Sequence, residues 1–374
     1  MARTLSGPTL LPDGTIRDAT LTLHDGKIAS LHAGLEPGTD LVTRGVIAPG
    51  FVDLQVNGGF GCDFTQDPSS ICLVSERLPR TGVTAYLPTC VTSPIEGYAG
   101  WLESAAEAAA ASYGAQVAGF HLEGVYFSPH RTGAHNPALM RPIDVHEIVT
   151  RYANHPMVRI VTLAPELPHA LDAIAALVHC GVIVSAGHSN ATWDEAQRAI
   201  EAGIGWGTHL FNAMHELRHR EPGLPLALLL SQVPVGLIAD GVHLHPAIIQ
   251  LALRLKGAAG ITLVTDAMAA MGNPPGVYNL GGFDVHVDEH AARLATGTLA
   301  GSILTMDAAV RYLVDQCGCS IADALIMASR TPADLLRLHN KGRLVVGADA
   351  DIVVLDESLH VAATLVAGEV VHQA

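Results

Sequence analysis

Four residues that can bind a metal or move a proton each follow a short apolar run of the sequence. Glu123 follows VAGFHL, His188 follows VIVSAG, His209 follows GWGT, and Asp266 follows ITLVT. One such residue after one run is more often a cap or a turn former, so a lone match carries little weight. Four together indicate a common site, because the carboxyl ends of the strands of a barrel meet on one face.

The first three residues supply one carboxylate and two imidazoles, a ligand set for a zinc-like metal. Glu123, His188 and His209 would leave a fourth position open for water, as catalytic rather than structural sites do. A metal lowers the pKa of that water and can polarise an acyl oxygen. Asp266 is then placed to accept the proton of the water and to pass it to the leaving group. The sequence therefore predicts metal-dependent hydrolysis.

Eight short apolar or β-branched runs alternate with helix-like stretches along the middle of the chain. The runs cover residues 51–56, 83–88, 116–122, 158–164, 182–187, 204–208, 235–239 and 261–265. This alternation predicts a (β/α)8 TIM-like barrel. An open doubly wound sheet is disfavoured because no GxGxxG word follows the first run. Among the helices, residues 192–203 carry a capping box of Thr192 and Glu195, with Gly203 as the stop.

The two ends of the chain alternate polar and apolar residues, as strands do. The stretch TLTLHDGKIASLHAG has a two-residue turn at Asp25-Gly26, and DIVVLDESLHVAATLVAGEVV near the C-terminus has the same pattern. We expect residues 1–49 and 346–374 to form one small β-sandwich domain beside a barrel of residues 50–345. A β excursion at 277–299 precedes a final helical region at 302–338.

Composition narrows the function further. The chain has 374 residues, 49% of them hydrophobic, which suits one barrel and a smaller domain. A net charge of -15 argues against nucleic acid or an anionic membrane as partner, and an anionic substrate would need a local group of positive or N–H donors. No secretory signal or membrane-spanning run is apparent, and the six cysteines form no CxxC pair. We expect a cytoplasmic protein.

The words around the four residues resemble the N-acetylglucosamine-6-phosphate deacetylases of the amidohydrolase superfamily. They are APGFVDLQVNGGFGCDF at 48–64, HLEGVYFSPHRTGAHNP at 121–137, SAGHSNAT at 185–192, THLFNAMHELRHREPG at 208–223, IADGVHLHP at 238–246 and LVTDAMAAMG at 263–272. The resemblance extends to GADADIVVLD at 347–356. It implies hydrolysis of N-acetylglucosamine 6-phosphate to glucosamine 6-phosphate and acetate.

The resemblance also assigns roles to individual residues. It implies the same metal ligands as above, with Asp266 as general base and acid. His135 matches a residue that hydrogen-bonds the acetyl oxygen of the substrate, which suits oxyanion stabilisation. His243 matches a histidine that contacts the substrate.

The phosphate of the substrate has its own expected partners. Asn212 and Ala213 match a pair whose backbone N–H groups hold the phosphate, as N–H groups at the start of a helix do. Arg220 matches an arginine that reaches the phosphate from the neighbouring subunit. The expected assembly is therefore a homodimer whose sites are completed across the interface.

Three departures from the family pattern carry their own expectations. Gln55-Val56-Asn57 stands where many amidohydrolases have an HxH pair for a second metal, so we expect one divalent metal, zinc first, with iron, cobalt or manganese as alternatives. Val125 and the word Met214-His215-Glu216 also depart, and we expect both to line the substrate loop.

The departures leave rival functions open. One is deacetylation of another N-acetylhexosamine 6-phosphate. A second is hydrolysis of a different acyl-amine or cyclic amide. A third is a sugar-phosphate binding or regulatory protein that has lost turnover.

Overall fold

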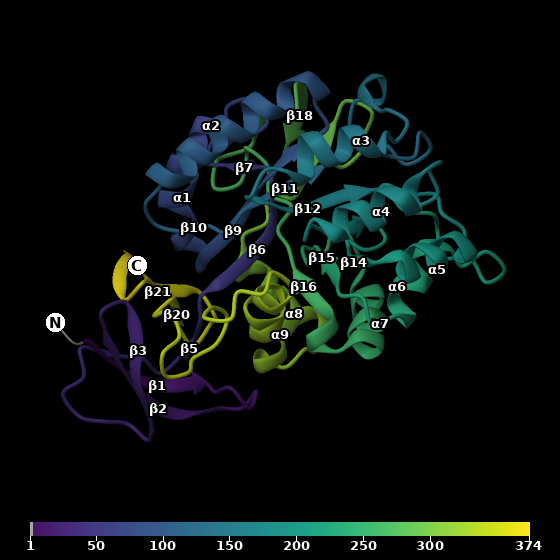
Figure 1. The fold of residues 1–374 in the computed structure, drawn as a ribbon. Helices are drawn as coiled ribbons and strands as arrows, with labels where there is room; N and C mark the ends of the chain where they lie inside the picture. Colours follow the sequence, from purple (N-terminus) through teal and green to yellow (C-terminus); the bar gives the residue numbers. More distant parts are fainter. Residues whose placement is uncertain (1–2) are drawn as a thin grey trace.

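Eight parallel strands form the centre of the computed structural model, which describes residues 3–374 (Figure 1). In sheet order they are β6 (Phe51–Val56), β9 (Val83–Val91), β11 (Phe120–Glu123), β12 (Val158–Leu163), β13 (Ile183–Ala186), β14 (Ile204–Gly207), β15 (Val235–Leu237) and β16 (Ile261–Leu263). Every neighbouring pair in this order is parallel. The predicted barrel is confirmed.

The barrel closes where the chain leaves β16 and meets the end of β6. The Asp266 N–H donates to the Gln55 carbonyl at 3.0 Å, and the Asn57 N–H donates to the Ala267 carbonyl at 2.8 Å. Val56 and Ala267 form an isolated parallel bridge. First and last strands are therefore joined at their carboxyl ends, next to Asp266.

Helices surround the barrel (Figure 1). The α-helices are α1 (Ile71–Arg77), α2 (Tyr98–Ala111), α3 (Val145–Ile148), α4 (Ala170–His179), α5 (Trp193–Ala202), α6 (Gly223–Leu230), α7 (Pro246–Lys256), α8 (Met306–Cys317), α9 (Ile321–Ala328) and α10 (Arg330–Leu335). The predicted capping box is present, since the Thr192 hydroxyl accepts from the Glu195 N–H and the Glu195 carboxylate accepts from the Thr192 N–H. Gly203 ends that helix with φ 122°. Among the helices of residues 3–374, none combines the length and hydropathy that a membrane crossing requires.

Strands from the first and the last part of the chain meet in one β domain (Figure 1). Its strands are β1 (Arg3–Leu10), β2 (Ile16–His24), β3 (Lys27–Ala33), β4 (Leu41–Val42), β5 (Val46–Pro49), β20 (Ile352–Leu355), β21 (Val361–Val366) and β22 (Glu369–Gln373). β20 pairs antiparallel with β5 and so joins the two ends. Leu5, Leu21 and Leu365 are buried together in its core, as the expected β-sandwich requires. Residues 1 and 2 of the predicted domain lie outside the described residues, and the boundaries at 49/50 and 345/346 stay a prediction.

Smaller β elements lie over one part of the barrel. The expected excursion is a three-stranded antiparallel sheet of β17 (Gly276–Leu280), β18 (Phe283–Val287) and β19 (Ala292–Leu294). β10 (Gln116–Val117) pairs with β9, and β7 (Gly58–Gly59) pairs with β8 (Cys62–Asp63). The final helical region follows the excursion as α8, α9 and α10.

A buried ion-pair cluster lies in the segment between α10 and β20. The Lys341 ammonium contacts the Asp351 carboxylate and lies 3.0 Å from the Asp349 carboxylate. Burial alone would lower the pKa of Lys341, but the charge of Asp351 outweighs it and the pKa is raised, so the ammonium stays charged at neutral pH. Asp351 is only 4% exposed and also accepts from the Ala367 N–H.

Lys341→Met should therefore lower stability strongly, because it leaves the buried Asp351 carboxylate without its cation. We expect a loss of about 3–5 kcal/mol, or roughly 4–6 °C in the apparent Tm of a thermal melt. Lys27→Met is the matched control: Lys27 pairs with Asp349 at 2.6 Å, but its side chain is 47% exposed. That exposed pair should contribute less than about 1 kcal/mol. Equal Tm losses in the two variants would contradict the argument.

Candidate active site

The three predicted metal ligands converge on one point at the carboxyl end of the barrel. His209 Nε2 lies 3.1 Å from both His188 Nε2 and Glu123 Oε1, and His188 Nε2 lies 3.4 Å from Glu123 Oε1. Around a tetrahedral metal with bonds of about 2.0–2.1 Å, ligand atoms are separated by about 3.3 Å. The triangle therefore has the size that one shared metal ion requires.

The electrostatics of this triangle also favour a cation at its centre. Burial alone would raise the pKa of Glu123, but hydrogen bonds from His188 and His209 outweigh burial and hold it well below its usual range. Burial lowers the pKa of His188. For His209 burial acts in the same direction, but the Glu123 carboxylate outweighs it and raises the pKa. One carboxylate that stays ionised beside two imidazole nitrogens is a donor set that fits a divalent ion.

Neighbouring groups aim these ligand atoms. His188 Nδ1 donates to the Arg131 carbonyl at 3.1 Å, which leaves Nε2 with its lone pair free for a metal. The Phe127 ring stacks on His188 with centroids 4.2 Å apart. Gln55 Nε2 donates to Glu123 Oε1 at 2.9 Å. Gln55 is therefore a donor that orients one of the ligands.

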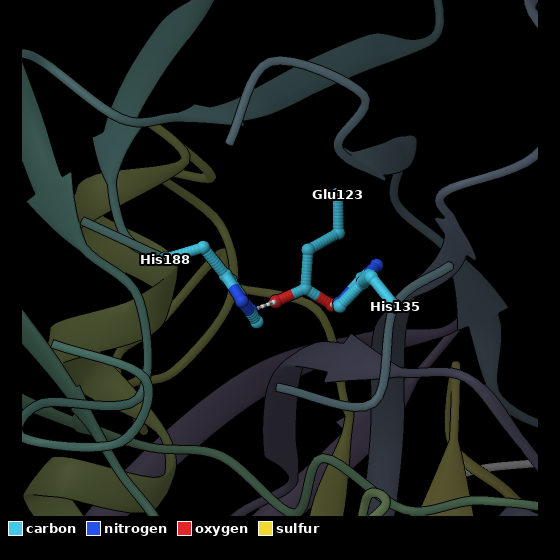
Figure 2. A group of neighbouring side chains, drawn as sticks. All are labelled: Glu123, His135 and His188. Carbon is cyan, nitrogen blue, oxygen red and sulfur yellow. Dashed lines mark ion pairs between the residues drawn. The ribbon is translucent and has the colours of Figure 1, made fainter. Parts of the chain in front are cut away.

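His135 is the fourth polar group at the centre, and it makes a second ligand set with Glu123 and His188 geometrically possible. Figure 2 shows Glu123 between the two rings, one carboxylate oxygen toward each. His135 Nε2 is 4.0 Å from Glu123 Oε2. However, His135 Nδ1 accepts from the Thr92 N–H at 3.3 Å and lies 2.9 Å from the Thr92 hydroxyl, and with both bonds made to Nδ1 the proton of the neutral ring lies on Nε2. Burial, with His188 adding to it, lowers the pKa of His135 to about 3. His135 is therefore a neutral N–H donor, whereas His209 is the better third ligand.

Asp266 lies at the same mouth with one carboxylate oxygen already engaged. Asn57 Nδ2 donates to Asp266 Oδ1 at 2.7 Å. Burial, and then the negative charge of Glu123, raises the pKa of Asp266 to about 6. A carboxylate with this pKa is a stronger base than an exposed aspartate while still ionised at neutral pH.

A cavity of about 550 Å³ opens above these groups. Its polar lining comprises Asn57, Glu123, His130, Arg131, Thr132, His135, His188, His209, Asn212, His243, Asp266, Arg293 and Thr298. Ala213 also lines it, so the structure brings together every site residue expected from the sequence except Arg220. Two arginines supply the local positive charge that an anionic substrate needs in a protein of net charge -15.

Arg131 and Arg293 were not singled out by the sequence. Arg131 stands within the word HLEGVYFSPHRTGAHNP, close to His135, so its place in that loop was the available signal. Arg293 lies on β19, far along the chain from the ligands, and Thr298 follows in the same hairpin. Only the folding of the β17–β19 sheet over the barrel brings them to the cavity.

His243 is held by a neighbouring acid. His243 Nδ1 lies 2.6 Å from Asp240 Oδ2, and both the His243 and Val242 N–H groups donate to Asp240 Oδ1. Burial alone would raise the pKa of Asp240, but the hydrogen bond from His243 outweighs it and the pKa is lowered. The second ring nitrogen of His243 is left for the cavity.

The pair that we expected to bind phosphate differs from expectation in its local structure. Asn212 and Ala213 do not begin a helix; they lie in a turn, and the next helix, α6, starts at Gly223. The Asn212 N–H is already donated to the His209 carbonyl at 3.0 Å. The Ala213 N–H has no acceptor within residues 3–374, and its φ of 50° belongs to a left-handed turn. The helix expectation was wrong because this segment bends sharply to place His209.

Val125 and Met214, which depart from the family pattern, do not face the cavity. Val125 is fully buried and Met214 is 2% exposed, and neither lines the cavity. His215 and Arg220 line a separate cavity of about 750 Å³ beside α5 and α6. The expectation that Val125 and Met214-His215-Glu216 line the substrate loop was wrong for this cavity, since Val125 and Met214 are buried and His215 lines the separate cavity.

Comparison with known proteins places this fold and site. The amidohydrolase family matches residues 46–371, and the chain therefore belongs to the amidohydrolase family, a class of metal-dependent hydrolases. Among its relatives, the N-acetylglucosamine-6-phosphate deacetylase of Bos taurus is 44% identical, over 88% of this chain and 84% of its own. The N-acetylgalactosamine-6-phosphate deacetylase of Escherichia coli is 38% identical over 96% of each chain.

A solved structure agrees with these relatives. A variant of the N-acetyl-D-glucosamine-6-phosphate deacetylase of Mycobacterium smegmatis, in complex with N-acetyl-D-glucosamine 6-phosphate, superposes with a TM-score of 0.94. It is 37% identical, and the match covers 99% of each chain. Within the amidohydrolases, this chain groups with the amino-sugar-phosphate deacetylases.

Metal content of two variants should decide between the two possible ligand sets. His209→Asn should lose at least about tenfold in metal affinity, because it removes one of three ligands. His135→Asn should keep the metal content of the unmodified protein, because His135 donates an N–H. Elemental analysis after dialysis measures both and gives the number of metal ions per chain. Loss of metal from the His135 variant with retention in the His209 variant would reverse the assignment.

Proposed function

We propose that this protein hydrolyses the N-acetyl amide of N-acetylglucosamine 6-phosphate, releasing glucosamine 6-phosphate and acetate. The observation that carries the proposal is the convergence of Glu123, His188 and His209 beside a base and a neutral N–H donor. These groups are the parts that amide hydrolysis needs. The 44% identical deacetylase relative supports the choice of substrate.

Asp266 and His135 divide the proton chemistry. Asn57 occupies Asp266 Oδ1, so Oδ2 is the atom that takes the proton of the attacking water and gives it to the departing amine nitrogen. His135 Nε2–H donates to the acetyl oxygen as negative charge develops there. The C–N bond breaks, the oxygen of water stays on the acetyl carbon, and acetate leaves. A bound divalent metal supplies Lewis acidity that polarises the acetyl group and makes water more acidic.

We propose one divalent metal per chain, most suitably zinc. Glu123, His188 and His209 would hold it, with iron, cobalt or manganese as alternatives for this ligand set. Gln55 and Asn57 support a single ion, because neutral amides are poor replacements for the imidazoles that hold a second metal. Two equivalents of metal in dialysed protein would contradict this count.

The rest of the cavity suits a sugar phosphate. A volume of about 550 Å³ lies within the usual range for small-ligand pockets. His243 and the Ala213 N–H supply donors for the phosphate end or the sugar hydroxyls.

The six cysteines are all unpaired, which supports a reducing, cytoplasmic location for the reaction.

A second candidate is deacetylation of N-acetylgalactosamine 6-phosphate. It is favoured by the Escherichia coli relative, which matches 96% of this chain. The two sugars differ only in the orientation of one ring hydroxyl. The polar groups around the ring, including Arg293 and Thr298, would discriminate between them.

Acetate release from a panel of amides tests the proposal. The metal-loaded protein should release acetate from N-acetylglucosamine 6-phosphate with kcat/KM at least about a hundredfold above that for the unphosphorylated sugar. The unphosphorylated sugar leaves the protein groups that would hold the phosphate without a partner. The panel includes the 6-phosphates of N-acetylgalactosamine and N-acetylmannosamine. Preference for the galacto sugar would favour the second candidate. Thermal stabilisation by these ligands without acetate release would indicate a binding protein instead.

The active site is proposed to be completed by Arg220 of a second subunit. Within one chain Arg220 lies in a different cavity from Glu123 and Asp266. Its guanidinium is solvated there, with Glu221 and Trp193 lining the same hollow. In a homodimer this guanidinium would reach the phosphate of the neighbouring site.

Mixed dimers test that arrangement. Asp266→Asn should lower kcat by about 10²–10⁴-fold, and Arg220→Ala should mainly raise KM. Subunits of the two kinds, co-expressed with different tags and purified as a mixed dimer, should regain about half of the normal activity. One of the two sites then has both an intact Asp266 and an Arg220 from its partner. No recovery in the mixed dimer would show that Arg220 does not act across the interface.

A further inference from the structure

Asp266 has a backbone conformation that few residues other than glycine adopt. Its φ is 50°, in the left-handed region. Hydrogen bonds fix the peptide groups on both sides: the Asp266 N–H donates to the Gln55 carbonyl at 3.0 Å, and its carbonyl accepts from the Ser302 N–H at 2.8 Å. Such a turn persists only where the surrounding structure holds it. The aim of the Asp266 carboxylate therefore depends on its neighbours.

The Thr265 hydroxyl forms a hydrogen bond across this turn. It accepts from the Ala267 N–H at 3.2 Å, so it connects the residues before and after Asp266. The hydroxyl has one proton, and it points to Asp53 Oδ2, 2.6 Å away. The direction of the hydroxyl is thus set by Asp53.

Asp53 lies on β6 and is fully buried, and its carboxylate accepts hydrogen bonds from three donors. Besides the Thr265 hydroxyl, the N–H groups of Thr265 and Gln55 approach Oδ1, each at 3.3 Å. No cationic side chain within residues 3–374 forms an ion pair with it. Burial raises the pKa of Asp53 to about 7, while the three donors act in the opposite direction and favour the ionised carboxylate, which only accepts. An asparagine at position 53 would replace one carboxylate oxygen with an N–H₂ group, so that one of the three donors would face another donor.

We infer that Asp53 is a positioning residue for Asp266, acting through the Thr265 hydroxyl, an assignment that rests on the proposed function. Asp53 comes from the first strand and Asp266 follows the last. The contact therefore couples closure of the barrel to the aim of the base. A shift of the reacting group by about 1 Å can cost a hundredfold in rate, so a small rotation of this turn is sufficient to impair catalysis.

Thr265→Val tests the inference, because valine keeps the shape of threonine and removes the hydroxyl. We expect kcat to fall by about tenfold to a hundredfold, with KM changed by less than about twofold and metal content unaltered. Thr265→Ser, which restores the hydroxyl, should recover most of the lost kcat. Asp53→Asn should reproduce the kcat loss of Thr265→Val.

Thr262→Val is the matched control. Thr262 is on the same strand, β16, is fully buried, and accepts from Trp206 Nε1 at 3.0 Å, away from the cavity. This variant should show a comparable fall in Tm with normal kcat.

The outcomes separate this inference from the proposed function. A folded, metal-loaded Thr265→Val enzyme with normal kcat would overturn the positioning role, as would a serine variant no better than valine or equal kcat losses at 262 and 265. The proposed function would fail differently, through an Asp266→Asn variant that still releases acetate at the normal rate.

Discussion

The convergence of Glu123 Oε1, His188 Nε2 and His209 Nε2 is the interaction on which the rest of the site depends. These atoms lie 3.1–3.4 Å apart in a buried setting. Lone pairs that face one another at this distance in a buried setting repel unless a positive charge lies between them. A divalent ion satisfies all three, and its charge also lowers the cost of burying the carboxylate. The site is therefore organised around a positive charge.

The same type of backbone turn positions three of the polar residues at the mouth of the barrel. His188, His209 and Asp266 each lie two or three residues beyond the end of a strand, and each has a positive φ, of 48°, 26° and 50°. The left-handed turn bends the chain across the mouth of the barrel and brings the side chain inward. Such backbone costs about 1–3 kcal/mol per residue. The surrounding hydrogen bonds offset that cost and give each side chain one orientation.

Sequence reasoning succeeded where a residue acts through its neighbours along the chain. The capping box of Thr192 and Glu195 and the turn at Asp25-Gly26 are present because both are local. It failed at Asn212, where a helix was expected and a tight turn is found. It also gave Gln55 only the negative role of a missing ligand, whereas its amide orients Glu123 across the barrel. The role of Gln55 depends on a contact between strands, which no local pattern encodes.

The sequence by itself determined the barrel, the β domain built from both ends, and the polar residues at the strand ends, because alternation of apolar runs and the chemistry of Glu, His and Asp are local properties. Only the tertiary structure decided how these residues act together. It separated His135, with its proton on Nε2, from the predicted ligand His209, and it brought Arg293 to the cavity. Distances between segments far apart in the chain decide such roles, and they exist only after the barrel has closed.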